Sequence, residues 1–277
     1  FHTKAWLKRY HQDMKYRHKN VFLLSSSAYA PFDYRLFLSY KNKTYKWGYF
    51  PEVYELDIED VLNKKDPNQI LWIGRMIDWK RPILAIKVFE DLVKEHRQLK
   101  LSLIGDGPLL NDLKTYVIKK NLQEHITFLG ALKPKDVHHA LLTSSITLMT
   151  SNRKEGWGAV LNEAMSTLNV PFAYYKIGAA PYLIKNNETG FMFSSKKDLH
   201  QKIKNILKNQ ELKSRIQKNA YHNMKTLWHP KVAAQRLLAF SNCLLEQNVY
   251  EFKDGPLSKA AVILERDVKK TLSYVKK

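Results

Sequence analysis

The stretch EGWGAVLNEAM, residues 155–165, places two carboxylates, Glu155 and Glu163, on either side of a turn that holds two glycines. An ionised carboxylate only accepts hydrogen bonds, and it pairs well with the neighbouring hydroxyl groups of a sugar. The backbone amides of residues 158–160 stand where we expect a helix over AVLNEAM to begin, and amides at such a position attract anions. The pattern therefore favours a ligand that carries both hydroxyl groups and phosphate.

A second loop supplies cations. The sequence GRMIDWK places Arg75 and Lys80 between an expected strand and a helix that Pro82 opens. Both cations can approach an anion that the helix N-terminus also attracts through its free amides and its dipole. Two helix starts and two cations at one crevice predict a pyrophosphate. With one acid on each side of the pyrophosphate, the pattern predicts a nucleotide sugar, whose hexose would lie at Glu155 and whose ribose would lie at Glu163.

Simpler interpretations stay open for these four side chains. Arg75 and Lys80 could be two solvated loop charges. Glu155 could be a partner of the helix dipole, and Glu163 could be an ordinary glutamate on a helix surface. The sequence alone does not exclude any of them.

Four glycines follow expected strands, at Gly74, Gly105, Gly107 and Gly130. They stand where a ligand would lie, but glycines at such places also serve tight turns. The segment GDGPLL does not match a dinucleotide fingerprint, because Leu110 occupies the third glycine position and no first strand of such a unit precedes it. We therefore do not expect nicotinamide or flavin binding.

The elements that position these loops follow from short apolar runs, which predict buried strands. Stretches of helical period separate them, such as those that start at Pro82 and Leu109. The alternation predicts an α/β fold with a Rossmann-like, doubly wound parallel sheet, whose ligand lies beyond the carboxyl ends of the strands. The runs occupy residues 21–24, 70–74, 101–105, 126–130, 146–150, 170–175 and 190–193.

EGWGAVLNEAM resembles the paired-glutamate motif of the retaining glycosyltransferases of family four, which have the two-domain GT-B fold. The resemblance continues in the same order through WIGRMIDWKRP, LIGDGPLLNDL, ITFLGALKP and NETGFMF, over about residues 70–240. YKWGYFPEV is similar to a subgroup that makes bacterial polysaccharides. The resemblance implies transfer from a nucleotide sugar, with retention, onto a glycan or lipid-linked acceptor of a capsule, exopolysaccharide or lipopolysaccharide.

The resemblance also implies a role for each matching residue. Glu155 would act on the transferred sugar, Arg75 and Lys80 would stabilise the leaving pyrophosphate, and Glu163 would hold the ribose. The backbone of residues 129–132 would contact the base. The other donor-binding residues that it implies are Gly74, Gly105, Gly107, Leu129, Gly130, Leu132, Gly156, Trp157, Gly158, Ala159 and Val160.

Two departures from the family limit what the resemblance implies. Where relatives often have a glycine pair and a glutamate, this chain has KIGAAPYLI, with Ala179, Ala180 and Tyr182, so sugar selection in that loop is not implied. Residues 1–60 hold no match to the catalytic histidine motif of many relatives. Neither a metal nor a cofactor is expected, because the chain shows no His and Asp spacing for a metal site and GT-B enzymes characteristically work without one.

We expect three segments. Residues 1–60 would be the remnant of an N-terminal acceptor domain with the interdomain linker, residues 61–245 the Rossmann-like donor-binding domain, and residues 246–277 a helical tail. The chain starts with Phe1, within what reads as a helix, so we expect upstream sequence to be missing.

Composition adds expectations about partners. The 46 Lys and Arg against 26 Asp and Glu give a net charge of +20, which predicts attraction to polyanions. We expect an anionic membrane surface, contacted through residues 196–218 and through Lys8, Arg9, Lys15, Arg17 and Lys19.

The lysines of the expected helices lack interleaved aromatic residues, so nucleic acid is not expected. The single cysteine, Cys243, favours a reducing compartment, and no run of about 18 apolar residues occurs. The location predicted is therefore cytoplasmic, peripheral at the inner face of the membrane. A different class stays open, namely a catalytically inactive module that binds nucleotide sugars or polyanions.

Overall fold

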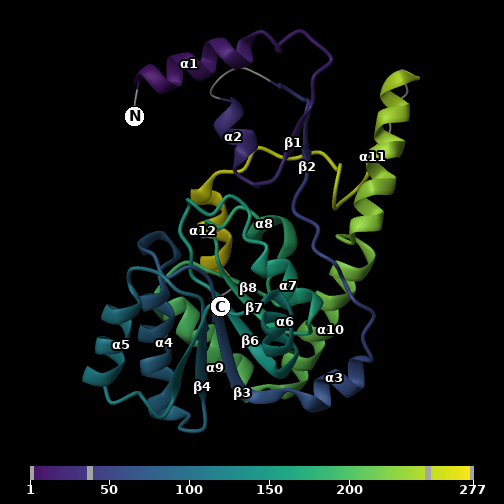
Figure 1. Cartoon of the computed structure of the whole chain (residues 1–277). Helices are drawn as coiled ribbons and strands as arrows, with labels where there is room; N and C mark the ends of the chain where they lie inside the picture. The colour runs from purple at the N-terminus through teal and green to yellow at the C-terminus, as the bar shows by residue number, and fades with distance from the viewer. Residues whose placement is uncertain (1–2, 36–39, 247–250, 275–277) are drawn as a thin grey trace.

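The computed structural model describes residues 3–35, 40–246 and 251–274. A six-stranded parallel sheet with the strand order β5-β4-β3-β6-β7-β8 forms its centre (Figure 1). This order confirms the predicted doubly wound sheet: the chain adds β4 and β5 on one side of β3 and then returns to add β6, β7 and β8 on the other, so the order reverses between β3 and β6. The strands are β3 (Asp66–Ile73), β4 (Lys100–Ile104), β5 (Ile126–Gly130), β6 (Ser144–Met149), β7 (Val170–Tyr174) and β8 (Phe191–Phe193).

Helices cover both faces of the sheet, which explains why its strands are apolar in a continuous run. In β3, Ile70 and Trp72 pack into the large core under α4, α5 and α9, whereas Leu71 packs on the other face with α6 and α7. Helix α10 packs against α7, and α3 packs against α6. The helices are α3 (Ile58–Lys64), α4 (Pro82–Glu95), α5 (Leu110–Lys119), α6 (Pro134–Thr143), α7 (Val160–Ser166), α8 (Ala180–Leu183), α9 (Lys196–Lys208) and α10 (Gln210–Thr226).

The N-terminal part of the chain holds a second, small sheet. Strand β1 (Leu23–Ser25) pairs in parallel with β2 (Thr44–Lys46). The predicted strand at residues 21–24 is confirmed with a shift toward the C-terminus. Strand β2 was not predicted, because three residues are too few to show alternation. Helices α1 (Thr3–Met14) and α2 (Ala30–Arg35) complete this part.

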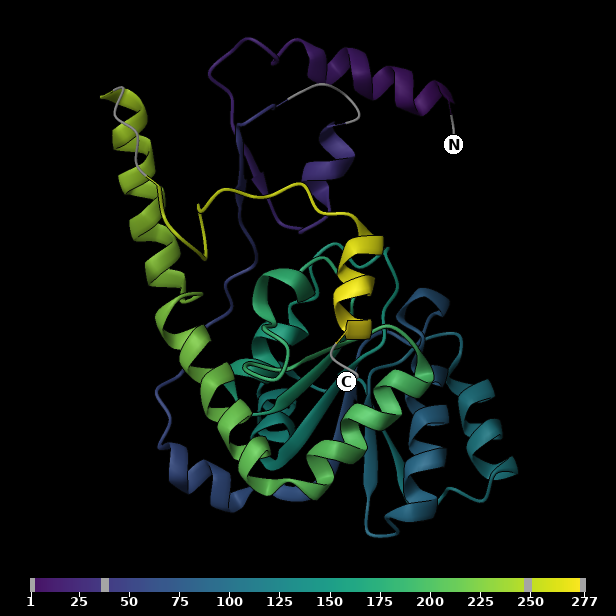
Figure 2. The same cartoon turned by 180° about the vertical axis from the view of Figure 1, so that it is seen from behind.

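The C-terminal stretch returns to the N-terminal part. After α11 (Pro230–Leu245) the chain passes β1 and β2 and reaches α12 (Glu265–Tyr274), as both views show (Figure 1, Figure 2). The amide of Leu257 donates to the Lys46 carbonyl at 2.8 Å, and the Lys46 amide donates to the Ser258 carbonyl at 2.8 Å. Backbone hydrogen bonds therefore join residues 257–258 to β2, although the two segments lie near opposite ends of the sequence.

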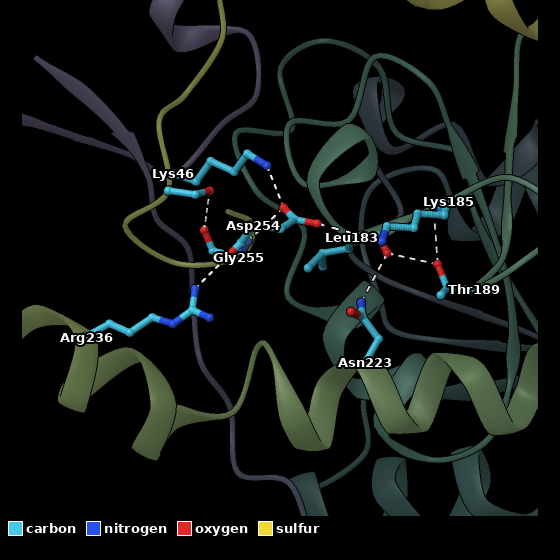
Figure 3. A network of polar contacts seen from close by, with 9 residues as sticks. Lys46, Leu183, Lys185, Thr189, Asn223, Arg236, Asp254 and Gly255 are labelled. Carbon is cyan, nitrogen blue, oxygen red and sulfur yellow. Dashed lines mark hydrogen bonds and ion pairs between the residues drawn. The ribbon is translucent and has the colours of Figure 1, made fainter. Parts of the chain in front are cut away.

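Asp254 fastens this returning stretch (Figure 3). Its carboxylate accepts a hydrogen bond from Lys46 Nζ at 2.7 Å, and Arg236 of α11 donates to the Asp254 carbonyl. Burial acts to raise the pKa of Asp254, but the bonds from Lys46 and from the Gly255 amide outweigh it and lower that pKa. The tail is thus held by ionic contacts as well as by backbone pairing.

The cations of α9 and α10 are largely engaged within the protein. In α9, Lys196 pairs with Asp91 at 2.7 Å, and in α10, Lys218 pairs with Glu59 at 2.6 Å. By contrast Lys8, Lys15, Arg17 and Lys19 are exposed, while the side chain of Arg9 lies outside the described residues. Within the described ranges, no helix has the length and apolar character needed to cross a membrane.

Candidate donor-binding site

The loops beyond the carboxyl ends of β3, β4 and β5 interlock through their glycines. The Gly105 amide donates to the Gly130 carbonyl at 2.7 Å, and Gly105 has a φ of 125°. A Cβ on Gly105 would lie 2.0 Å from the Gly74 carbonyl oxygen, and one on Gly107 would lie 2.6 Å from that of Met76. Turn geometry therefore accounts for Gly105 and Gly107 without a ligand.

Gly74, Gly130 and Gly156 differ from those two. No atom lies within 4 Å of a Cβ built on Gly130 or Gly156, and Gly74 makes only ordinary contacts. Gly130 has a φ of 68°, which suits glycine, while its surroundings are open. Space for a ligand therefore exists beside Gly130 and Gly156.

Lys80 and Glu155, 75 residues apart in the sequence, form an ion pair. Lys80 ends a short 3₁₀ helix, Asp78–Lys80, that precedes α4, and Glu155 lies in the loop between β6 and α7. The two side chains are 18% and 11% exposed, so the pair is largely buried but still reached by solvent. Arg75 is exposed, and within the described residues its side chain makes no hydrogen bond or ion pair. The predicted residues Lys80 and Glu155 thus meet, and Arg75 stays apart.

The other side of the Glu155 loop rests on Gly178. The Gly178 amide donates to the Glu155 carbonyl at 3.1 Å, and its own carbonyl accepts from the Ala28 amide at 2.8 Å. A Cβ on Gly178 would lie 1.7 Å from the Gly156 carbonyl oxygen. Sequence reasoning missed this residue, although it stands in the KIGAAP segment that departs from the family. Gly178 therefore links the N-terminal part of the chain to the loop of Glu155.

Trp157, at the centre of the same loop, is 3% exposed. Its Nε1 donates to Asn162 Oδ1 at 2.8 Å, and its ring centroid lies 5.8 Å from that of Trp228. A Cβ on Gly48 would lie 2.4 Å from the ring, so this linker glycine permits the contact. The indole therefore anchors the loop, and only the backbone of Trp157 is left for a ligand.

Glu163 lies one turn inside α7 and is partly buried. Burial raises the pKa of its carboxyl group, and within the described residues that group has no hydrogen-bond partner. Glu163 is therefore not the ordinary surface glutamate that the sequence left open. The amides of residues 158–160 likewise donate to no acceptor in the described part of the chain. Both kinds of group, amide donors and a carboxylate acceptor, are available at the start of α7.

The sequence of this part of the chain matches a known protein family. Residues 54–223 match the family described as "Glycosyl transferases group 1". The chain belongs to this family. The match covers the whole six-stranded sheet and both glutamates.

Among curated relatives of this group 1 chain, spore coat protein SA of Bacillus subtilis is 24% identical over 61% of the chain and 47% of the relative. N-acetyl-alpha-D-glucosaminyl L-malate synthase of Bacillus anthracis is 33% identical over 41% of the chain and 28% of the relative. The chain spans about half the length, or less, of the curated relatives it matches.

Solved structures share the fold of this group 1 chain. A mutant of TarM from S. aureus, in complex with UDP and two other compounds, superposes with a TM-score of 0.69 at 20% identity, over 86% of this chain and 46% of that one. HepE from Anabaena, in complex with UDP, gives a TM-score of 0.68 at 17% identity, over 80% of this chain and 64% of that one. At these identities the likeness confirms the GT-B type of fold.

The side chains of Leu129 and Leu132 do not belong to the cluster around Lys80 and Glu155. They line a pocket of about 340 Å³ between α6 and the sheet, together with Gln69, Ser102 and His139. None of these residues takes part in the contact between Lys80 and Glu155. The predicted contact of the 129–132 backbone with a base stays a prediction.

Metal ligands are not gathered in the described residues. Across 3–35, 40–246 and 251–274, no three His, Cys, Asp or Glu side chains lie together in a way that could hold a metal ion.

Proposed function

We propose that this chain is the donor-binding part of a glycosyltransferase that takes a hexose from a nucleoside-diphosphate sugar, with retention, and transfers it to a glycan or lipid-linked acceptor. The observation that carries the proposal is the contact of Lys80 with Glu155. Near it in the sequence lie the amides of residues 158–160 and the carboxyl of Glu163, which have no hydrogen-bond partner among the described residues. A cation and amide donors suit phosphate, and carboxylates suit sugar hydroxyl groups.

The ion pair sets the order of events in binding. A pyrophosphate carries more charge than one carboxylate, so it displaces Glu155 from the Lys80 ammonium. The freed carboxylate then accepts hydrogen bonds from the transferred sugar, with the backbone of Gly156, Trp157 and Gly158. Arg75, which is exposed and unpaired among the described residues, adds its charge on the open side. Arg75 and Lys80 then stabilise the negative charge that develops on the leaving group.

The role in bacterial polysaccharide synthesis, and the location at the cytoplasmic face of the membrane, belong to the same proposal. One relative is the alpha-monoglucosyldiacylglycerol synthase of Streptococcus pneumoniae, whose name specifies a lipid product. The exposed cations Lys8, Lys15, Arg17 and Lys19 suit an anionic surface, whereas the ion-paired cations of α9 and α10 suit it less. We propose that the reaction requires no metal or other cofactor.

A thermal-shift panel tests the donor. Two similar structures are complexes with UDP and with UDP-glucose, so these ligands come first, followed by GDP, ADP and CMP with their sugars. We expect a nucleoside diphosphate to raise the melting temperature of this chain, equally with and without EDTA. A panel in which no nucleotide raises it would contradict the proposal.

A transfer assay separates the enzyme from an inactive binding module. More than half of each of these two curated relatives lies outside the matched region. We therefore expect this chain alone to bind donor without transfer, and to transfer sugar in a membrane extract only when it is joined to an acceptor-binding part. Donor binding without transfer to any acceptor in a broad screen would favour the binding module instead.

A further inference from the structure

We propose that Arg81 is a positioning residue that couples Lys80 to the loop of Glu155. Arg81 itself does not face the ion pair, because its guanidinium is turned to the ends of β6 and β7. The part of this inference that concerns ligand affinity rests on the proposed function. The part that concerns coupling between the two loops stands on the contacts alone.

The backbone of Arg81 is the first observation. Its φ of 51° and ψ of 50° place it in the left-handed region, which is unfavourable for a residue with a Cβ. It stands directly between Lys80 and Pro82, the first residue of α4. Such a conformation persists only where surrounding contacts enforce it, and it is found preferentially at functional sites.

The side chain of Arg81 supplies those contacts. Its Nε donates to the Thr150 carbonyl at 2.5 Å, and its Nη2 lies 3.4 Å from the Ser151 carbonyl. Its guanidinium stacks on the ring of Tyr174, 4.0 Å from the centroid. Thr150 and Ser151 follow β6 directly and lead into the loop that carries Glu155. One side chain thus joins the ends of β6 and β7.

Thr150 returns the connection to the backbone of the cation loop. Its hydroxyl lies 2.8 Å from the Lys80 carbonyl and 2.9 Å from the Arg81 carbonyl, and it accepts from Trp72 Nε1 at 2.9 Å. The residue is fully buried. The backbone of Lys80 is therefore bonded to the same segment that leads to its side-chain partner, Glu155. Removing the Arg81 side chain loosens that segment without touching either charge.

Arg81→Gly tests the coupling, because glycine accepts the left-handed backbone and only the side chain is lost. We expect amide hydrogen exchange over residues 151–158 to become at least about tenfold faster, while that of β3 and α4 changes little. Asn121→Gly is the matched control. Asn121 also has a left-handed backbone, with a φ of 53°, at the end of α5, so its replacement relieves the same strain away from the site. The control should leave exchange over residues 151–158 unchanged.

Ligand binding gives the second readout. We expect Arg81→Gly to weaken UDP binding by about 2-fold to 30-fold, the range typical of residues that act through others. If Arg81 acts by positioning Lys80, its effect should be largely lost in the Lys80→Ala background. Arg81→Lys keeps the charge but not the planar fork, and it should behave like Arg81→Gly.

The two readouts separate the possible failures. Unchanged exchange over residues 151–158 in Arg81→Gly would overturn the coupling, whatever the ligand does. Faster exchange with fully additive effects of Arg81→Gly and Lys80→Ala on UDP binding would overturn the action through Lys80. A wild-type chain that binds no nucleotide would refute the proposed function, while the exchange measurement would still decide whether Arg81 couples the two loops.

Discussion

The two ends of the parallel sheet use lysine in opposite ways. At the amino ends of the strands, Lys65 Nζ donates to the carbonyls of Leu141, Leu142 and Ser144 at 3.0, 3.1 and 2.5 Å, and its residue is 7% exposed. At the carboxyl ends, the Lys80 side chain has a carboxylate partner and is 18% exposed to solvent. The first lysine is saturated by the protein, whereas the second can exchange its partner for a ligand.

Helix polarity explains the difference. Lys65 lies at the C-terminus of α6, where unpaired carbonyls gather and attract a cation. Lys80 precedes the N-terminus of α4, where amides attract an anion, so a cation there strengthens a site for anions. The same residue type is therefore structural at one end of the sheet and available for binding at the other.

The largest effect we expect is on stability, from Lys65→Ala. It removes three hydrogen bonds, although the Leu141 carbonyl still accepts from Asn169 Nδ2 at 2.7 Å. At roughly 1 kcal/mol for each lost bond, the free energy of unfolding should fall by about 2 to 3 kcal/mol. Urea unfolding measures it. Lys64→Ala is the control, since the Lys64 side chain is 69% exposed and, within the part of the chain that the structure describes, pairs only with Asp60 of α3; it should change the same quantity by less than about 0.5 kcal/mol. Equal losses for the two variants would remove the contrast between the ends of the sheet.

Lys80→Ala should show the reverse pattern. We expect nucleoside diphosphate affinity to fall by about 1.5 to 3 kcal/mol, because a charge-assisted contact is lost, with nucleoside affinity little changed. Calorimetric titration with UDP and with uridine measures both. Lys154→Ala removes an exposed charge next to Glu155 and serves as the control for general electrostatics. If both variants weakened UDP binding equally, the carboxyl end of the sheet would attract UDP through its general positive charge and not through a specific site at Lys80.

The buried lysines also predict a pH dependence of stability. Burial lowers the pKa of Lys65 to about 7, with a contribution from the charge of Lys213, and burial lowers that of Lys213 to about 8. The unfolded chain, with ordinary lysine pKa values near 10.5, binds more protons between pH 7 and 10.5. The free energy of unfolding should therefore rise with pH in that window, by up to about 1.4 kcal/mol per pH unit for each lysine.

Urea unfolding at pH 7, 8 and 9 measures this rise, and Lys213→Met provides the comparison. Lys213 Nζ donates to the Pro67 carbonyl at 2.9 Å, and the residue is 2% exposed. The variant should show a smaller rise over the same window, because one of the two displaced pKa values is gone. A profile that stays flat or falls from pH 7 to 9 in the wild-type chain would show that these lysines keep ordinary pKa values.

The smallest effect we expect comes from Glu163→Gln. The amide keeps the shape and can still accept from a ribose hydroxyl, but the charge is lost, so the affinity for UDP should fall by about 1 kcal/mol. The affinity for a dideoxyribose analogue of UDP should stay the same, because it lacks the hydroxyl groups. Equal losses for both nucleotides would place Glu163 away from the ribose.

Local patterns in the sequence were sufficient for most of the donor-binding fold. All six strands of the large sheet, and the helices from Pro82, Leu109 and the EGWG turn, are present near their predicted bounds. Continuous apolar runs report strands buried on both faces, and helical period reports the helices that bury them. The acids and cations of the candidate site could be proposed as well, because their types and their places after strands are local properties; their roles stay predictions.

Other features depended on contacts between distant residues. Neither the meeting of Lys80 with Glu155 nor the close approach of Gly178 to Gly156 leaves a periodic trace in the sequence. Strand β2 forms because β1 and residues 257–260 lie beside it, on three residues with little signal of their own. Lys65 and Lys80 are the same residue type in the sequence. Only the tertiary structure places Lys65 at the end of one helix and Lys80 before the start of another, and this placement decides which lysine can bind a ligand. The sequence by itself thus determines residue types and the hydrophobic periodicity that predicts strands and helices. The tertiary structure decides which side chains become partners, which are buried and which charges are left for a ligand, because it brings distant segments together.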